Sequence, residues 1–143
     1  MLHAGFPGER YTMVENQDTL AELNLLVIRL YQQGKYKEAL RIAHQSAHLT
    51  KDTFGGDYPD YAESLNNLAL MYDSLGVYEK AEPLCMQALH TRKKALGDEH
   101  PDYAESLNSL TGLYYSMGAY EKAEPLYLQV LQIRQKAWGD DQP

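Results

Sequence analysis

Two histidines, His44 and His48, stand four residues apart in a segment with helical periodicity. That spacing places both imidazole rings on one face of a helix, where they could share a metal ion. Zinc sites need three or four ligands, however, and the residue that follows His44 is Gln45 rather than a carboxylate. No third ligand stands nearby in the sequence, so we predict a pair of surface histidines and no metal site.

The single cysteine, Cys85, is the other side chain with intrinsic reactivity. It stands in a row of apolar residues, which favours a packed thiol over a nucleophile. The sequence contains no G-x-S-x-G motif and no glycine-rich phosphate loop, and its acidic turn "GDEHP" lacks the spacing of a calcium-binding loop. Because no nucleophile, base and orienting group can be assembled, we predict that the chain is not an enzyme and uses no cofactor.

Three asparagines, Asn24, Asn66 and Asn108, indicate binding rather than catalysis. A primary amide donates and accepts hydrogen bonds at once, so a row of amides can hold a peptide backbone without reading its sequence. The same asparagines could instead bind a neighbouring element or cap local backbone, since a buried polar group must find some partner. They are spaced 42 residues apart, and this spacing recurs throughout the chain.

The sequence repeats itself with a period of 42 residues. The stretch "YPDYAESLNNLALMYDSLGVYEKAEPL" begins at Tyr58, and a near copy, "HPDYAESLNSLTGLYYSMGAYEKAEPL", begins at His100. Residues 60–99 and 102–141 are identical at 25 of 40 positions, and an earlier, more diverged copy keeps the same spacing. One pair of helices cannot bury its apolar stripe alone, so repeats of this kind stack into a solenoid.

Each repeat predicts two helices and no strand. The first helix of the second repeat, near residues 60–74, carries Leu65, Leu68 and Tyr72 at helical spacing. The second helix carries a similar stripe of apolar and small residues and ends near Gly97. The corresponding first helices of the other repeats are expected near residues 17–32 and 102–116.

Particular residues mark the ends of these helices. Asp60 precedes Glu63 by three residues, a capping-box pattern that predicts the start of the first helix. Gly76 stands where that helix should end, because glycine tolerates the left-handed conformation found there. Pro83 lies about one and a half turns into the second helix, where it removes one backbone hydrogen bond. The third repeat contains all of these residue types at the same positions.

The apolar and small residues of the repeat resemble the tetratricopeptide signature. They are Leu65, Leu68, Ala69, Tyr72, Gly76, Tyr78, Ala81, Cys85 and Ala88. The 42-residue unit, with "LNNLA" and "YEKAEPL", is similar to the repeats of kinesin light chain and nephrocystin-like proteins. The resemblance implies an all-α fold, an α-solenoid that twists into a right-handed superhelix. Its parts would be a partly flexible N-terminal lead at 1–16 and three helix-turn-helix repeats at 17–58, 59–100 and 101–143.

The resemblance also implies a function, that of a non-catalytic scaffold for protein–protein interaction. In such a scaffold the first helices line a concave groove that binds a peptide segment. If the apolar stripe of each first helix faces the second helix, another set of its side chains points into the groove. We predict the binding residues to be Asn24, Ile28, Tyr31, Glu63, Asn66, Asn67, Leu70, Asp73, Glu105, Asn108, Ser109 and Tyr115.

The charges of the chain predict which partners this groove prefers. The expected first helices carry several carboxylates and a single cation, Arg29, whereas the second helices hold most of the Lys and Arg residues. Some of these carboxylates complement helix dipoles, but the groove as a whole should be acidic. We therefore expect neutral, aromatic or basic peptides to bind and acidic peptides to be repelled.

The overall composition narrows the choice of partner further. The net charge of −7 and the pI near 5.1 argue against nucleic acid and anionic membranes, which both attract clustered Lys and Arg. No apolar run is long enough to cross a bilayer, and the first residues do not form a signal peptide. We therefore expect a cytoplasmic protein.

The last residues raise a question of self-association. The final "GDDQP" copies the "GDEHP" turn, so the sequence stops where a fourth repeat would begin. Solenoids usually end in a capping helix, and we expect Ile133, Ala137 and Trp138 to be left uncovered. Two other functions stay open: a self-assembling structural module, or a sensor fragment of a larger signalling or effector protein with a caspase-like or nucleotide-switch domain.

Overall fold

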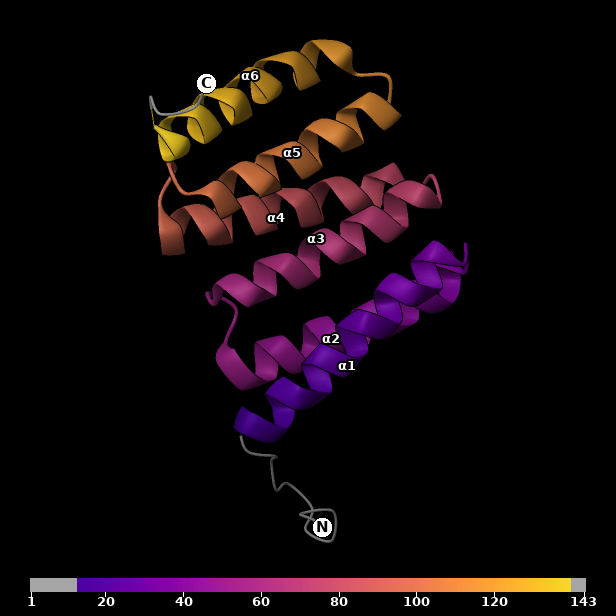
Figure 1. Cartoon of the computed structure of the whole chain (residues 1–143). Coiled ribbons are helices and arrows are strands. Elements are labelled where there is room, and N and C mark those ends of the chain that lie inside the picture. The colour runs from indigo at the N-terminus through magenta and orange to yellow at the C-terminus, as the bar shows by residue number, and fades with distance from the viewer. Residues whose placement is uncertain (1–12, 140–143) are drawn as a thin grey trace, which may run out of the picture.

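The structure, a computed structural model, describes residues 13–139 of the chain, and within them it contains helices and no strand. Figure 1 shows the helices stacked in chain order. They are α1 (Met13–Gln32), α2 (Tyr36–Phe54), α3 (Pro59–Ser74), α4 (Tyr78–Leu96), α5 (Pro101–Ser116) and α6 (Tyr120–Trp138). Each helix packs on the ones before and after it, and α3 also contacts α5. The fold is an all-α solenoid of three helical hairpins.

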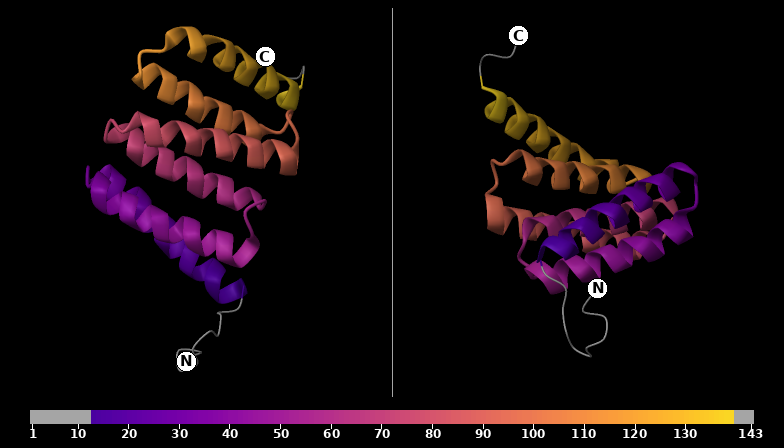
Figure 2. Two further views of the ribbon diagram at one scale, coloured as in Figure 1. Left: turned by 180° about the vertical axis from the view of Figure 1, so that it is seen from behind. Right: turned by 60° about the horizontal axis from the view of Figure 1, so that its bottom comes forward.

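The helices at the two ends of the stack differ from the others in what they contact. Figure 2 shows α1 and α6 at opposite ends of the array, so within residues 13–139 each has a neighbouring hairpin on one side only. The inner helices α2 to α5 are packed on both sides. None of the described helices combines the length and apolar character that a membrane crossing requires.

Helix α1 begins at Met13, four residues earlier than the sequence indicated. The segment 13–16, which was assigned to the N-terminal lead, is therefore helical. No proline or glycine between Met13 and Gln32 interrupts the helix, so it extends to the N-terminal side of the repeat. The rest of the expected lead, residues 1–12, lies outside the described residues.

The predicted capping boxes are wrong. The residue that caps α3 is Tyr58, and Asp60 lies inside the first turn, because Pro59 occupies the first helical position. Proline is favoured there, since its fixed φ suits the helix and its missing N–H would have had no partner. In α5 the cap is His100, whose Nδ1 accepts a hydrogen bond from the backbone N of Asp102 at 3.0 Å.

The predicted ends of the first helices are confirmed. Gly76 has a φ of +76° and follows the last turn of α3. The N–H of Gly76 donates to the carbonyl of Asp73 at 2.9 Å, and the N–H of Val77 donates to that of Tyr72 at 2.8 Å. This pair of bonds is a Schellman motif, which satisfies two carbonyls that the helix leaves open.

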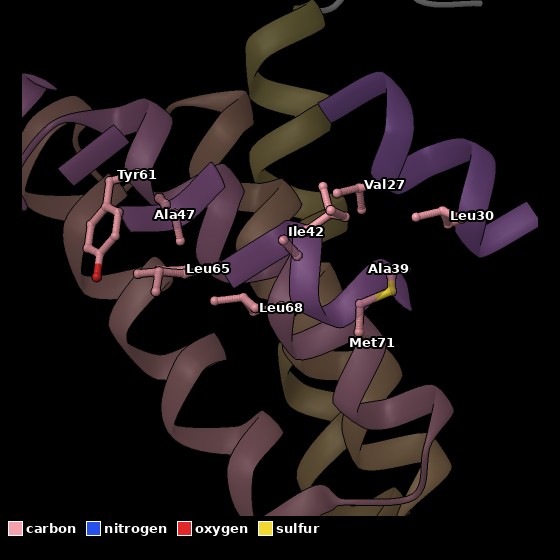
Figure 3. Packing of buried hydrophobic residues seen from close by; sticks show 12 residues of the cluster. Val27, Leu30, Ala39, Ile42, Ala47, Tyr61, Leu65, Leu68 and Met71 are labelled. Atoms are coloured by element: carbon pink, nitrogen blue, oxygen red, sulfur yellow. The ribbon is translucent and has the colours of Figure 1, made fainter. Parts of the chain in front are cut away.

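The core lies between successive helices. Figure 3 shows Val27 of α1, Ile42 of α2 and Leu68 of α3 converging on one apolar cluster. Small residues allow the helices of each hairpin to approach closely, and Ala39, its counterpart Ala81 and the equivalent residue of α6 are completely buried. Ala69 and Ala81 belong to a second cluster, between α3, α4 and α5.

One residue of the last helix departs from expectation. Ile133 is buried, although it was predicted to lie on an uncovered end. It packs with Val130 and Leu107, because its face of α6 turns toward α5. Ala137 and Trp138 are exposed.

Candidate functional site

A pocket of about 320 Å³ opens between the first helices α3 and α5. Space is left there because Gly112 of α5 occupies the position that holds Leu70 in α3, and an added Cβ at Gly112 would meet nothing within 4 Å. Seven of the predicted binding residues line this pocket: Glu63, Asn66, Asn67, Leu70, Asp73, Glu105 and Ser109.

The pocket combines carboxylates with apolar surface. Glu63, Asp73 and Glu105 supply the negative charge, and the side chain of Glu105 is 62% exposed. Leu70 is partly exposed, whereas Leu113 is buried and belongs to the core cluster beneath.

Arg92 changes the predicted charge of this face. It was expected with the other cations of the second helices, on the opposite side from the groove. Its side chain is instead only 5% exposed and reaches α5. Its Nη1 lies 3.1 Å from Oε1 of Glu105 and donates to the carbonyl of Asp102 at 3.0 Å and to Oγ of Ser106 at 3.2 Å. Around the pocket, the first-helix face therefore carries carboxylates and one buried cation.

The electrostatics of the pocket act on the carboxyl of Glu63. Burial raises the pKa of this carboxyl above its ordinary value, and the guanidinium of Arg92 partly opposes that effect. The carboxylates of Asp60, Glu105 and Asp102 raise the pKa further. A positive charge placed in the pocket would relieve this repulsion and favour the ionised form.

The three asparagines do not form a uniform row. Oδ1 of Asn24 accepts a hydrogen bond from Oγ of Ser46 at 2.8 Å, inside the first hairpin. Nδ2 of Asn66 donates to Oγ of Ser106 at 3.1 Å, across the boundary between the second and third hairpins. Asn108 is exposed on α5. Contacts with neighbouring elements, which the sequence left open as an alternative, thus occupy one atom of Asn24 and one of Asn66.

Five of the predicted binding residues lie outside the pocket. Asn24, Ile28 and Tyr31 belong to α1, and Asn108 and Tyr115 lie along α5 away from the pocket lining. Ile28 and Tyr115 are each about half exposed. The structure therefore concentrates the candidate site on α3 and the facing side of α5.

The residues with potential reactivity have structural roles. Nε2 of His44 lies 3.1 Å from the hydroxyl of Tyr72, so this histidine joins the first hairpin to the second. No group of three or more metal-ligating side chains occurs within residues 13–139. Cys85 is buried, and burial raises the pKa of its thiol to about 12, which keeps it protonated at neutral pH.

Sequence reasoning missed the inward orientation of Arg92, although a signal was present. Ala81, Cys85, Ala88 and Arg92 follow one another at helical spacing, and all four are buried. Extending the apolar stripe by one turn would have identified the arginine as part of the packed face.

The family model described as tetratricopeptide repeat matches this chain twice, at residues 19–84 and 74–136. The chain belongs to the tetratricopeptide repeat family. Tetratricopeptide repeats are non-enzymatic scaffold folds that mediate protein–protein interactions. No curated protein matches the sequence.

Two solved structures resemble the chain closely in fold. A putative kinesin light chain of Podosopora anserina with nearly identical TPR-like repeats is 27% identical, with a TM-score of 0.77 over 87% of this chain and 59% of that one. BtubC (BKLC) from P. vanneervenii is 23% identical, with a TM-score of 0.77 over 90% of this chain and 50% of that one. The chain thus spans between half and three-fifths of the length of these proteins, and its repeats are similar to kinesin light chain-like repeats.

Proposed function

We propose that this tetratricopeptide repeat chain is a scaffold that binds a peptide segment of another protein in the pocket between α3 and α5. The bound segment carries a lysine or arginine, whose charged end lies beside Glu63 and Glu105, and Asp73 lines the pocket further along α3. The observation that carries the proposal is that three carboxylates line one partly apolar pocket. The sequence predicted a groove along all the first helices that favours basic, aromatic or neutral peptides. The proposal places the basic side chain of such a peptide in one part of that groove, the pocket between α3 and α5.

The shape and lining of the pocket favour a long side chain over a small ion. The methylene groups of lysine or arginine can lie along Leu70, which is 43% exposed, while the charged group reaches the carboxylates. A charged group paired in this way makes hydrogen bonds roughly twice as strong as neutral ones. Tyr115, half exposed on the same helix as Glu105, offers an aromatic contact for a neighbouring peptide residue.

The buried arginine limits how strongly an acidic peptide could be attracted. Arg92 is held by Glu105 and by two groups of α5. Its guanidinium is thus committed to internal contacts, and the carboxylates remain the accessible charges. An acidic peptide in the pocket would bring like charges together, and no Lys or Arg lines the pocket to offset them.

Amide groups near the pocket add hydrogen bonding to the peptide backbone. Asn67 lines the pocket, and Asn108 is exposed on α5. Oδ1 of Asn66 is buried and has no hydrogen-bond partner within the described residues. Amides can both donate to and accept from a backbone, so they suit a peptide of variable sequence.

A peptide-array binding assay tests the proposal, with basic, aromatic, neutral and acidic peptides at low and moderate salt. The pocket variant is Glu63→Gln with Asp73→Asn, and the control variant is Glu38→Gln with Glu121→Gln. The control removes the same charge from exposed first turns of α2 and α6. We expect the pocket variant to bind basic peptides about tenfold more weakly and the control to bind them as the native chain does.

Circular dichroism of both variants establishes that each remains helical, so a loss of binding cannot be attributed to unfolding. Acidic peptides that bind as well as basic ones would contradict the proposal. So would equal losses in the pocket variant and the control, because the effect would then follow net charge rather than the pocket.

A further inference from the structure

The outer side of α6 exposes three large apolar side chains. Tyr127 is 45% exposed, Leu128 54% and Leu131 45%. Their counterparts one repeat earlier are Cys85, Met86 and Leu89, and Cys85 and Leu89 pack in the core between α4 and α5. The repeat symmetry therefore indicates that α6 carries the same packing face as α4, and no helix of the described part of the chain covers that face.

Helix α1 carries the complementary face. Leu23 and Leu26 are the counterparts of Leu65 and Leu68, which pack against the preceding hairpin. In α1 these leucines line an open hollow together with Glu22 and Arg29. The two ends of the array are thus the two halves of a junction that the chain already forms twice internally.

One position recurs at both internal junctions. Thr50 of α2 lies with its Oγ1 3.4 Å from Oγ of Ser64 on α3. At the next junction the equivalent Arg92 of α4 donates to Oγ of Ser106 on α5 at 3.2 Å. The position of Thr50 and Arg92 on the second helix therefore contacts the position of Ser64 and Ser106 on the following first helix at both hairpin boundaries of the described residues.

The same position at the two ends of the array holds opposite charges. The counterpart of Arg92 on α6 is Arg134, and the counterpart of Ser106 on α1 is Glu22. Neither side chain forms an ion pair with another described residue. Two ends joined in the register of the internal junctions would therefore bring a guanidinium directly against a carboxylate.

We propose that copies of this chain stack head to tail, with α6 of one copy packing on α1 of the next. Arg134 of one copy then pairs with Glu22 of the next, and Leu131 packs on Leu23. The equivalent residues, Leu89 and Leu107, pack together in the core around α5. The occupant of both faces is a second copy, and this interaction uses neither α3 nor the peptide pocket.

The geometry of this contact predicts how the assembly grows. The two faces are different, so the contact is heterologous and each added copy exposes a new α6 face. The mass should rise continuously with concentration beyond that of two copies. A contact of α6 with α6 would instead be symmetric and stop at a dimer.

Light scattering on the full chain at increasing concentration gives the first test. We expect the weight-average mass to exceed two copies and keep rising. Changing Leu131→Lys should hold the chain as a monomer over the same range, because it places a charge in the apolar contact. A native chain that stays monomeric, or stops at two copies, would overturn the proposal.

Charge reversal tests the register. Arg134→Glu and Glu22→Arg should each shift association to a roughly tenfold higher concentration, because like charges would meet at the junction. An equimolar mixture should recover association, since alternating copies restore an opposite pair at every junction. Arg41→Glu, an exposed reversal on α2, serves as the control and should associate normally.

The mixture is the decisive arm. Recovery in the mixture supports the pairing of Arg134 with Glu22, because neither variant alone has it. Failure to recover, with both variants folded by circular dichroism, would overturn the proposed register. Peptide binding by the monomeric variants should be unaffected. The stacking of copies and the binding of a peptide are therefore tested independently.

Discussion

Nη1 of Arg92 lies 3.1 Å from Oε1 of Glu105, and the two belong to different hairpins of the array. The arginine is almost fully buried, while the side chain of Glu105 is 62% exposed. A cation of the second helix thus crosses to the first-helix face and holds one carboxylate of the candidate pocket in position. The same contact joins the second and third hairpins, so it links the stability of the stack to the charge of the site.

Replacing Arg92 should weaken the junction more than replacing its carboxylate partner. Arg92→Thr removes a donor to the carbonyl of Asp102 and one of the two donors to the hydroxyl of Ser106, and we expect a loss of about 2 kcal/mol of unfolding free energy. Glu105→Gln should cost less than about 1 kcal/mol, because that side chain is mostly exposed. Urea unfolding measures both. A larger loss for Glu105→Gln would mean that the ion pair, and not the buried hydrogen bonds, stabilises the junction.

Two glycines should respond to alanine in opposite ways. Gly76→Ala should lower the unfolding free energy by about 1 kcal/mol, because a φ of +76° disfavours a side chain even though nothing lies within 4 Å. Gly112→Ala should raise it by about 0.5–1 kcal/mol, since Gly112 lies inside α5 with open space around it. Thermal or urea unfolding of the pair provides the comparison. Two changes of the same sign would contradict this account.

Cys85 should be chemically inert in the folded chain. Burial raises the pKa of its thiol from 9.0 to about 12, so near pH 8 the reactive thiolate is roughly a thousandfold rarer than in the unfolded chain. Labelling with a thiol reagent should therefore be slow in buffer and fast in concentrated urea. Rapid labelling without denaturant would show that α3, α4 and α5 separate readily around the cysteine.

Binding of a basic peptide should strengthen as pH rises through the pKa of Glu63. Burial raises that pKa, so the carboxyl stays protonated to a higher pH than an ordinary glutamate, and in the protonated form it cannot pair with a cation. Affinity measured by titration calorimetry should increase between pH 4.5 and about pH 7.5, while the helical signal is checked at each pH. In Glu63→Gln this increase should be smaller. An unchanged pH dependence in that variant would assign it to other groups.

Much of the fold could be predicted from the sequence, because the repeat places the same residue types at the same helical phase. The end of α3 at Gly76 followed from the conformational freedom of glycine, and the stripe of Leu65 and Leu68 identified the packed face. The start of α3 was misjudged because Asp60 and Glu63 have the spacing of a capping box. Pro59 instead occupies the first helical position, so Tyr58 caps the helix and Asp60 lies in the first turn.

The candidate site was harder to predict from one sequence. Helical phase indicated the carboxylates and Asn67 that line the pocket. It could not show that Arg92 points inward or that Asn24 and Asn66 bond to Ser46 and Ser106, because such contacts depend on how hairpins pack. The pocket itself depends on Gly112, whose effect appears only when α3 and α5 are placed side by side.

Backbone amide chemical shifts in NMR spectra test most directly whether a basic peptide binds in the pocket between α3 and α5. The account predicts that the largest changes occur at residues 63–73 of α3 and 105–113 of α5, which hold nearly all of the pocket lining. Changes confined to α2, α4 and α6, with none around Glu63 and Glu105, would contradict it and would assign peptide binding to the second helices.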